Sequence, residues 1–263
     1  MPPVQSRTAQ PWLSLTEAPR AGLDLAALFA SAPFLSLSPR GDGHPVMVLP
    51  GFLADDDSTW VLRQFLNRLG YRTYPWGQDR NLGASAMGGY EPLVQEVLQI
   101  HRRHQRKVTL IGWSLGGVHA LAVAHRAEYA VRGVITLGSP LHPPSADGTD
   151  MTSIGRALQT AASSINAKPV AIPERWRNLA LKLSDALPVS SVFSRTDGVV
   201  PWRRSELAPG ANRENIRVVS SHIGLGFNPT VFYAIADRLA LREGKFKPFN
   251  TNGMRSLIYP PQN

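Results

Sequence analysis

The 263-residue sequence contains no cysteine. Disulfide bonds, thiolate metal ligands and a cysteine nucleophile are therefore excluded, whereas the redox state of the compartment stays open, because absence of cysteine fits either environment. The sequence also lacks any apolar run near the roughly 20 residues that a membrane-spanning helix needs. Acidic residues are few, since 19 Asp and Glu stand against 28 Lys and Arg, which gives a net charge of +9.

This basic excess would suit acidic partners such as nucleic acid or anionic lipid. Its densest cluster, residues 101–107, closes a predicted helix, where cations balance the negative end of the helix dipole. We therefore interpret the cluster as a helix end and expect no nucleic-acid partner. Peripheral contact with an anionic membrane stays an open alternative, and the sequence does not indicate an oligomeric state.

Residues 23–32 imitate the apolar core of a signal peptide, and Ala30-Ser31-Ala32 imitates its cleavage site. Asp24 interrupts this core and Glu17 precedes it, which is unusual for a secretory leader. We interpret the stretch as a short helix, over about 22–31, in an otherwise coiled extension of residues 1–44. We accordingly expect a cytoplasmic protein, with secretion as the alternative.

From residue 45 onward, short apolar runs alternate with amphipathic ones. This alternation predicts an α/β protein with a mostly parallel sheet of about six strands flanked by helices. The expected strands are 46–49, 72–74, 108–111, 131–137, 188–193 and 216–219. The expected helices are 58–69 with Ser58 as N-cap, a helix from about Glu91, 115–127, and 229–239 with Asn228 as N-cap, before a coil tail after Lys245.

The alternation stops between residues 141 and 187. Apolar residues at helical spacing over 151–165 predict one helix, and a second short helix is expected near 176–183. An insertion after the carboxyl end of a strand lies where α/β sheets bind ligands, which favours a lid or cap. A pair of ordinary packing helices is the open alternative. We thus expect an extension over 1–44 that packs on a domain of residues 45–263 with this insertion.

Gly112-Trp113-Ser114-Leu115-Gly116 lies between a predicted strand and a predicted helix. A G-x-S-x-G pattern in this context is typical of a nucleophile elbow, in which a sharp turn exposes the serine above the sheet. Gly112 and Gly116 would remove side chains that collide in such a turn. Without the flanking elements the pattern is weak, and an ordinary strand-to-helix turn is the alternative.

A serine hydroxyl needs a base to take its proton, and the base needs a third group to hold its tautomer. Asp197 follows the strand expected at 188–193, and His222 follows the one expected at 216–219. Because parallel strands end at the same edge of a sheet, these side chains can converge on Ser114. Less favoured bases are His44, His101, His104, His119, His125 and His142, and less favoured acids are Asp147, Asp150 and Asp185.

A tetrahedral intermediate also needs backbone N–H donors for its oxyanion. We expect one from Leu115, directly after the nucleophile. The second is expected from Phe52, in the loop after the first strand, with Leu53 as the alternative and Gly51 allowing a close approach.

Pro50-Gly51-Phe52, the segment 112–116, Asp197 and Ser221-His222 together resemble the α/β-hydrolase superfamily, and most of all bacterial esterases and lipases. The resemblance covers about residues 45–243. Many such lipases carry His-Gly where this chain has Pro50-Gly51, which argues against an HGGG-type loop. The resemblance implies a serine hydrolase that cleaves carboxylic esters through an acyl-enzyme intermediate.

Thioesterase and acyltransferase activity would use the same residues, and a non-catalytic ligand receptor is a remote alternative. We expect the substrate to contact Trp113, Leu53, Leu141 and Ile223, although ordinary core packing would explain an aromatic residue such as Trp113 equally well. No metal or cofactor is expected. Residues 55–57, three consecutive aspartates, are interpreted as a solvated loop or a helix-capping run.

Overall fold

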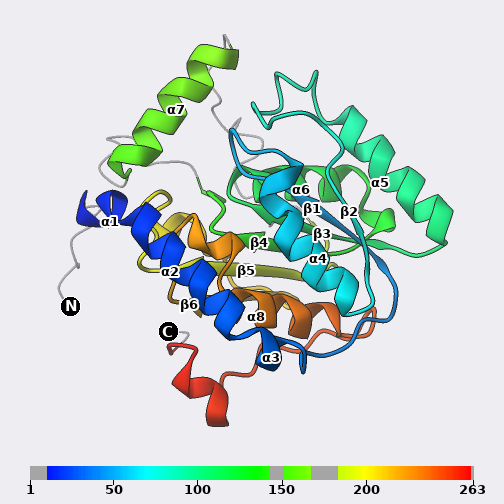
Figure 1. Ribbon diagram of the computed structural model, residues 1–263. Coiled ribbons are helices and arrows are strands. Elements are labelled where there is room, and N and C mark those ends of the chain that lie inside the picture. Colours follow the sequence, from blue (N-terminus) through cyan, green and yellow to red (C-terminus); the bar gives the residue numbers. More distant parts are fainter. Residues whose placement is uncertain (1–10, 143–150, 167–182, 262–263) are drawn as a thin grey trace.

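The computed structural model describes residues 11–142, 151–166 and 183–261 (Figure 1). Six strands form one sheet in the order β2-β1-β3-β4-β5-β6, and every neighbouring pair is parallel. The strands are β1 (Pro45–Leu49), β2 (Arg72–Tyr74), β3 (Val108–Trp113), β4 (Val131–Leu137), β5 (Val189–Ser194) and β6 (Arg213–Val218). The α/β fold and the six-stranded sheet predicted from the sequence are confirmed.

Each face of the sheet carries a layer of helices, with α5 and α6 on one side and α4 and α8 on the other (Figure 1). Alternate strand residues supply the two cores. Met47 and Leu110 pack with α5 and α6, whereas Val48 and Ile111 pack with α4 and α8. This double burial explains why the central strands are continuous apolar runs. The helices are α4 (Trp60–Arg68), α5 (Glu91–His104), α6 (Leu115–Arg126) and α8 (Pro229–Leu239).

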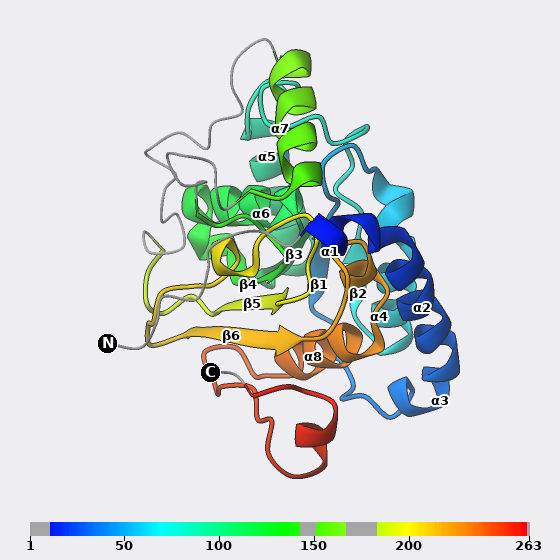
Figure 2. The ribbon, with the colours of Figure 1, turned by 90° about the vertical axis from the view of Figure 1, so that its left-hand side faces the viewer.

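The N-terminal extension is more helical than expected. It contains α1 (Pro11–Leu15), α2 (Glu17–Ala30) and α3 (Ala32–Leu35), instead of one short helix over 22–31. Pro19 does not delay the start of α2, because a proline in the first turn has no helical hydrogen bond to lose. Helix α2 packs on the segment after β6 and on α8 (Figure 2).

Helix α4 begins later than expected. Residues Asp56–Thr59 form a 3₁₀ turn, and the Asp55 carboxylate caps it by accepting the Asp57 N–H. Ser58 therefore lies inside this turn and is not the N-cap, whereas the capping interpretation of the aspartate run holds for Asp55. At α8, Asn228 accepts the N–H groups of Thr230 and Val231, which confirms the predicted N-cap.

Two further boundaries differ. Strand β6 begins at Arg213, three residues before the apolar run, because it is an edge strand whose first residues are polar and partly buried. The segment after Lys245 is not only coil, since Gly253–Leu257 forms a 3₁₀ turn and the buried rings of Phe249 and Tyr259 pack edge to face. The chain after α8 is therefore part of the packed structure.

Helix α7 (Ser153–Asn166) belongs to the insertion and projects from the body of the molecule beside α1 (Figures 1 and 2). Its base is anchored where the Thr152 hydroxyl donates to the Val199 carbonyl at 2.6 Å. The second helix predicted near 176–183 lies outside the described residues, apart from Leu183. No helix in the described ranges is long and apolar enough to cross a membrane.

Candidate active site

Ser114 sits in the turn between β3 and α6 with φ 54° and ψ −121°. A non-glycine residue in this region is strained. The turn is tight enough that a Cβ added to Gly112 would lie 2.3 Å from the Gly116 backbone, and one added to Gly116 would lie 2.3 Å from the Leu49 carbonyl oxygen. The two glycines therefore permit the close approach that the sequence pattern predicted.

The structure brings Ser114, His222 and Asp197 together. His222 Nε2 lies 3.0 Å from Ser114 Oγ, and His222 Nδ1 lies 2.7 Å from Asp197 Oδ2. The other carboxylate oxygen of Asp197 accepts the N–H groups of Val199 at 2.8 Å and Val200 at 2.7 Å. These bonds orient the carboxylate so that it can hold the imidazole with Nδ1 protonated and Nε2 facing the hydroxyl.

The His222 imidazole is buried next to the ionisable Asp197. Burial acts to lower the pKa of His222, but the charge and hydrogen bond of Asp197, together with the charge of Glu17, outweigh it and raise the pKa. The site thus favours a protonated imidazole, which is the state a base reaches after taking the serine proton.

Five of the six competing histidines make contacts elsewhere, and His125 is exposed on α6. His119 is buried between the Asn81 amide and the Tyr90 hydroxyl, and burial lowers its pKa to about 4. His44 lies between Asp42 and Thr109, and burial together with nearby arginines lowers its pKa to about 4 as well. His142 contacts the Glu206 carbonyl, His101 the Arg106 carbonyl and His104 the Tyr74 hydroxyl.

The loop after β1 passes beside the nucleophile, because a Cβ on Gly51 would lie 3.3 Å from the Ser114 Cβ. The Leu53 N–H donates to the Asn81 carbonyl at 2.8 Å, so it is not free to bind an oxyanion. This removes the alternative donor and leaves Phe52 and Leu115 as the predicted pair. Asn81 was not predicted. Its buried amide donates to the Pro50 carbonyl at 2.9 Å and so fixes this loop from a turn-rich segment with no recognisable motif.

The four residues predicted to contact substrate fall into two groups. Trp113 donates from Nε1 to the His222 carbonyl at 3.1 Å and packs edge to face on Phe227, and Leu141 is buried in the core. Leu53 and Ile223 are partly exposed, at 39% and 40%. Trp113 therefore supports the histidine loop, while substrate contact by all four residues stays a prediction.

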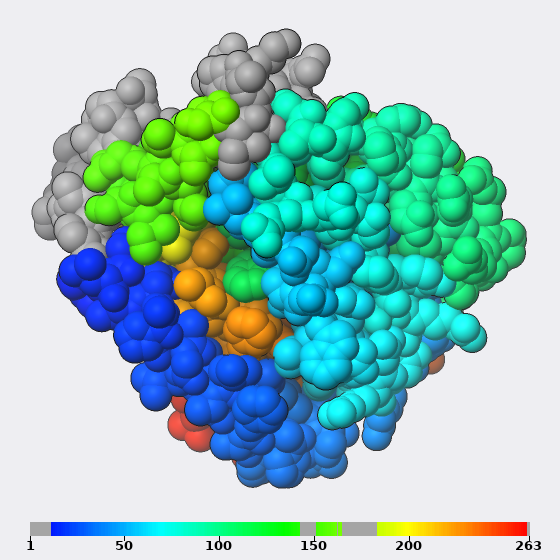
Figure 3. Space-filling view, turned by 45° about the horizontal axis from the view of Figure 1, so that its top comes forward, coloured from blue at the N-terminus to red at the C-terminus, as the bar shows by residue number. Residues whose placement is uncertain are grey.

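A groove of about 460 Å³ lies between the N-terminal helices and α4. Its walls are largely apolar, with two arginines among them. Figure 3 shows a hollow between the blue N-terminal helices and the cyan α4, with orange chain, the colour of the region around α8, on its floor. The lining residues include Leu28, Phe29, Trp60, Val61, Phe65 and Phe232, with Arg40 and Arg68.

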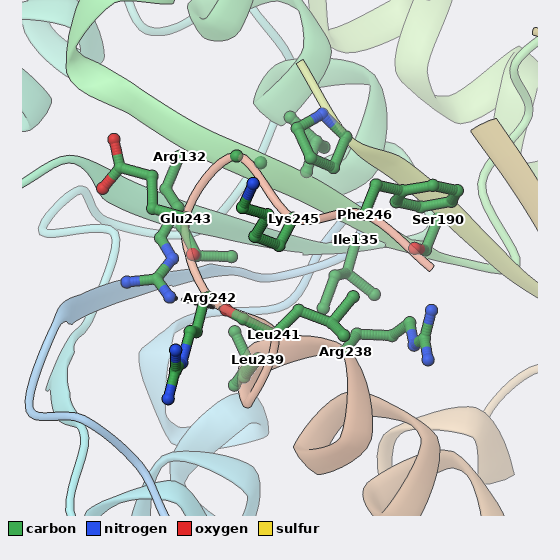
Figure 4. A pocket seen from close by; sticks show the side chains of 15 residues that line it. Arg132, Ile135, Ser190, Arg238, Leu239, Leu241, Arg242, Glu243, Lys245 and Phe246 are labelled. Atoms are coloured by element: carbon green, nitrogen blue, oxygen red, sulfur yellow. Dashed lines mark hydrogen bonds between the residues drawn. The ribbon is translucent and has the colours of Figure 1, made fainter. Parts of the chain in front are cut away.

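A second cavity, of about 50 Å³, lies at the opposite edge of the sheet (Figure 4). Thr109 and Arg132 near the starts of β3 and β4 line it, together with the segment after α8 that carries Glu243 and Lys245. Ser114 lies beyond the other end of β3. This cavity is therefore too small and too distant to hold a substrate of the serine.

Two acidic residues of α2 were also missed by sequence reasoning. Glu17 is 2% exposed and accepts backbone N–H groups from the loops that carry Asp197 and His222. Asp24 accepts from Ser220 and Ser221 in the same histidine loop. No sequence pattern signals these contacts, because they join residues about 200 positions apart.

Comparison with known proteins places the chain in a family. A family model described as a PGAP1-like alpha/beta domain matches residues 90–221, a range that includes Ser114 and Asp197 and ends directly before His222. The chain belongs to this family. The part of the chain that matches the family model runs from the start of α5 to the loop that carries His222.

Solved structures resemble the chain at low sequence identity. One, from work on the metagenome-derived lipolytic enzymes LipS and LipT, is 18% identical, with a TM-score of 0.52 over 77% of this chain and 94% of that one. Lipase B of Aspergillus fumigatus is 16% identical, with a TM-score of 0.57 over 84% of this chain and 58% of that one. Monoacylglycerol lipase of Paleococcus ferrophilus is 16% identical, with a TM-score of 0.53 over 77% and 96%. These likenesses show the α/β-hydrolase fold.

Proposed function

We propose that the protein is a serine hydrolase that cleaves carboxylic esters through an acyl-enzyme intermediate. The observation that carries the proposal is the continuous chain of contacts from Asp197 to His222 to Ser114, at 2.7 and 3.0 Å, on a strained elbow. The resemblance to solved lipases supports the same class of chemistry.

In the proposed reaction Ser114 Oγ attacks the ester carbonyl carbon while its proton passes to His222 Nε2. The carbonyl electron pair moves onto oxygen, and the N–H groups of Phe52 and Leu115 are proposed to stabilise this oxyanion. Collapse breaks the bond to the alcohol, which leaves with the proton from His222. Water then attacks the acyl-enzyme with His222 as base, releasing the carboxylic acid and restoring Ser114.

The groove between α2 and α4 is proposed to hold the acyl chain. Helix α4 begins at Trp60, after the loop that carries Phe52, and α2 begins at Glu17, which contacts the His222 backbone. Trp60 at the start of α4 lines the groove, whereas α2 lines it with Leu28 and Phe29 near its C-terminal end. The groove is therefore proposed to run along α4 from the edge of the sheet where Ser114 lies. The nine residues of α4 span about 13 Å, which matches an extended acyl chain of medium length.

The test is hydrolysis of p-nitrophenyl esters from acetate to palmitate, with Ser114→Ala as the matched variant. Loss of the nucleophile should lower kcat/KM by at least about 10⁴-fold. Activity that survives in Ser114→Ala would refute the serine mechanism. Absence of hydrolysis on every ester would refute the general esterase proposal.

A further inference from the structure

Glu17 is a buried carboxylate that the hydrolytic chemistry does not itself require. It lies at the start of α2, in the N-terminal extension, and is 2% exposed. Burying a carboxylate is unfavourable unless hydrogen bonds and a counter-charge compensate. Its partners therefore indicate why it is there.

Those partners are the two loops that carry the proposed acid and base. Glu17 Oε1 accepts the N–H of Gly198 at 2.7 Å, directly after Asp197, and the N–H of His222 at 3.1 Å. Glu17 Oε2 accepts the N–H of Ile223 at 3.1 Å. One carboxylate thus connects both loops.

A cation completes the cluster. Arg20 Nη2 lies 3.0 Å from Glu17 Oε1, and Arg20 Nη1 donates to the Thr196 carbonyl at 2.6 Å, just before Asp197. The extension also packs tightly here, because a Cβ added to Gly198 would lie 2.4 Å from the Leu13 carbonyl oxygen. Among the described residues, Arg20 contacts Glu17, Asp197 contacts the His222 imidazole, and Asp24 contacts Ser220 and Ser221 in the histidine loop.

We propose that Glu17 is a positioning residue of the hydrolytic site, which holds the loops of Asp197 and His222 in register and whose negative charge favours the imidazolium formed during catalysis. This inference rests on the proposed serine hydrolase function. A neutral acceptor could supply the backbone contacts, but a full negative charge stabilises a developing cation more strongly than a neutral dipole does. This stabilisation of the imidazolium agrees with the raised pKa of His222, to which the charge of Glu17 contributes.

Helix α2 offers a matched control. Asp24 accepts from the Ser220 hydroxyl at 2.9 Å, from the Ser221 N–H at 3.3 Å and from the Asn228 amide at 2.7 Å. It therefore fastens the same histidine loop without touching His222. Asp24→Asn should weaken contacts that hold the histidine loop and leave the charge next to His222 in place. Glu17→Gln removes that charge.

The experiment measures the pH dependence of kcat/KM for p-nitrophenyl ester hydrolysis. Glu17→Gln should lower kcat/KM by about tenfold, the equivalent of one weakened charge-assisted hydrogen bond, and move the acid limb to lower pH. Asp24→Asn should leave that limb in place. If Glu17→Gln does not move the limb, or both variants move it alike, the proposal is overturned.

Two further measurements keep the test decisive. Arg20→Gln removes the positive charge beside Glu17 and should move the acid limb the opposite way, to higher pH. This variant therefore tests the proposal even if Glu17→Gln does not fold. NMR titration of His222 in the Ser114→Ala background needs no ester turnover. A pKa of His222 that falls in Glu17→Gln supports the charge effect even if no ester is cleaved, and an unchanged pKa refutes it.

Discussion

Replacing Ser114 by glycine should make the protein more stable than replacing it by alanine. Both variants remove the hydroxyl and its bond to His222, so their difference isolates the backbone. At φ 54° and ψ −121° a residue with a Cβ is strained by about 1–3 kcal/mol, and glycine relieves this strain. Glycine also gives the unfolded chain more freedom, which offsets about 0.5–1 kcal/mol of the gain.

The net expectation is that the free energy of unfolding of Ser114→Gly exceeds that of Ser114→Ala by about 1 kcal/mol. For a chain of this size that corresponds to a rise in Tm of about 2–4 °C. Thermal and urea unfolding followed by circular dichroism would measure both quantities on the two variants side by side. If the glycine variant is equally or less stable, the elbow stores no strain and the reasoning fails.

Three other predictions follow from the same structure. Because the pKa of His222 is raised and only the neutral imidazole accepts the serine proton, kcat/KM should fall with decreasing pH, with a midpoint above the usual pKa of histidine. A midpoint below that usual pKa would contradict the charge assignment. Gly116→Ala should lower the free energy of unfolding, measured in urea, by about 3 kcal/mol, because the added Cβ would lie 2.3 Å from the Leu49 carbonyl oxygen. The control Gly22→Ala has open space around it in α2 and should raise the free energy of unfolding by about 0.5–1 kcal/mol. Val61→Trp should narrow the groove and reduce hydrolysis of palmitate esters while acetate hydrolysis stays unchanged, and an unaltered chain-length profile would place the acyl chain elsewhere.

Sequence reasoning succeeded where the signal is local. The strands β2 and β4 have the predicted bounds, and the N-cap at Asn228 follows from the side chain's own reach to nearby N–H groups. The predicted bounds were less accurate where tertiary packing, rather than the hydrophobic pattern of the sequence, decides where an element begins. The start of β6 does not look like a strand, because the first residues of this edge strand are polar and partly buried. Helix α2 starts before Pro19 rather than after it.

The sequence by itself determined the order of the six strands, the elbow around Ser114, and the candidates Asp197 and His222. Those signals are hydrophobic periodicity and glycine spacing, which act within a few residues. Only the tertiary structure decided that the Leu53 N–H is engaged by Asn81, and that Glu17 of the N-terminal extension holds the loops of the proposed acid and base. These contacts depend on how distant segments pack against one another. The sequence of a loop does not indicate which buried carboxylate or amide will bind its backbone groups.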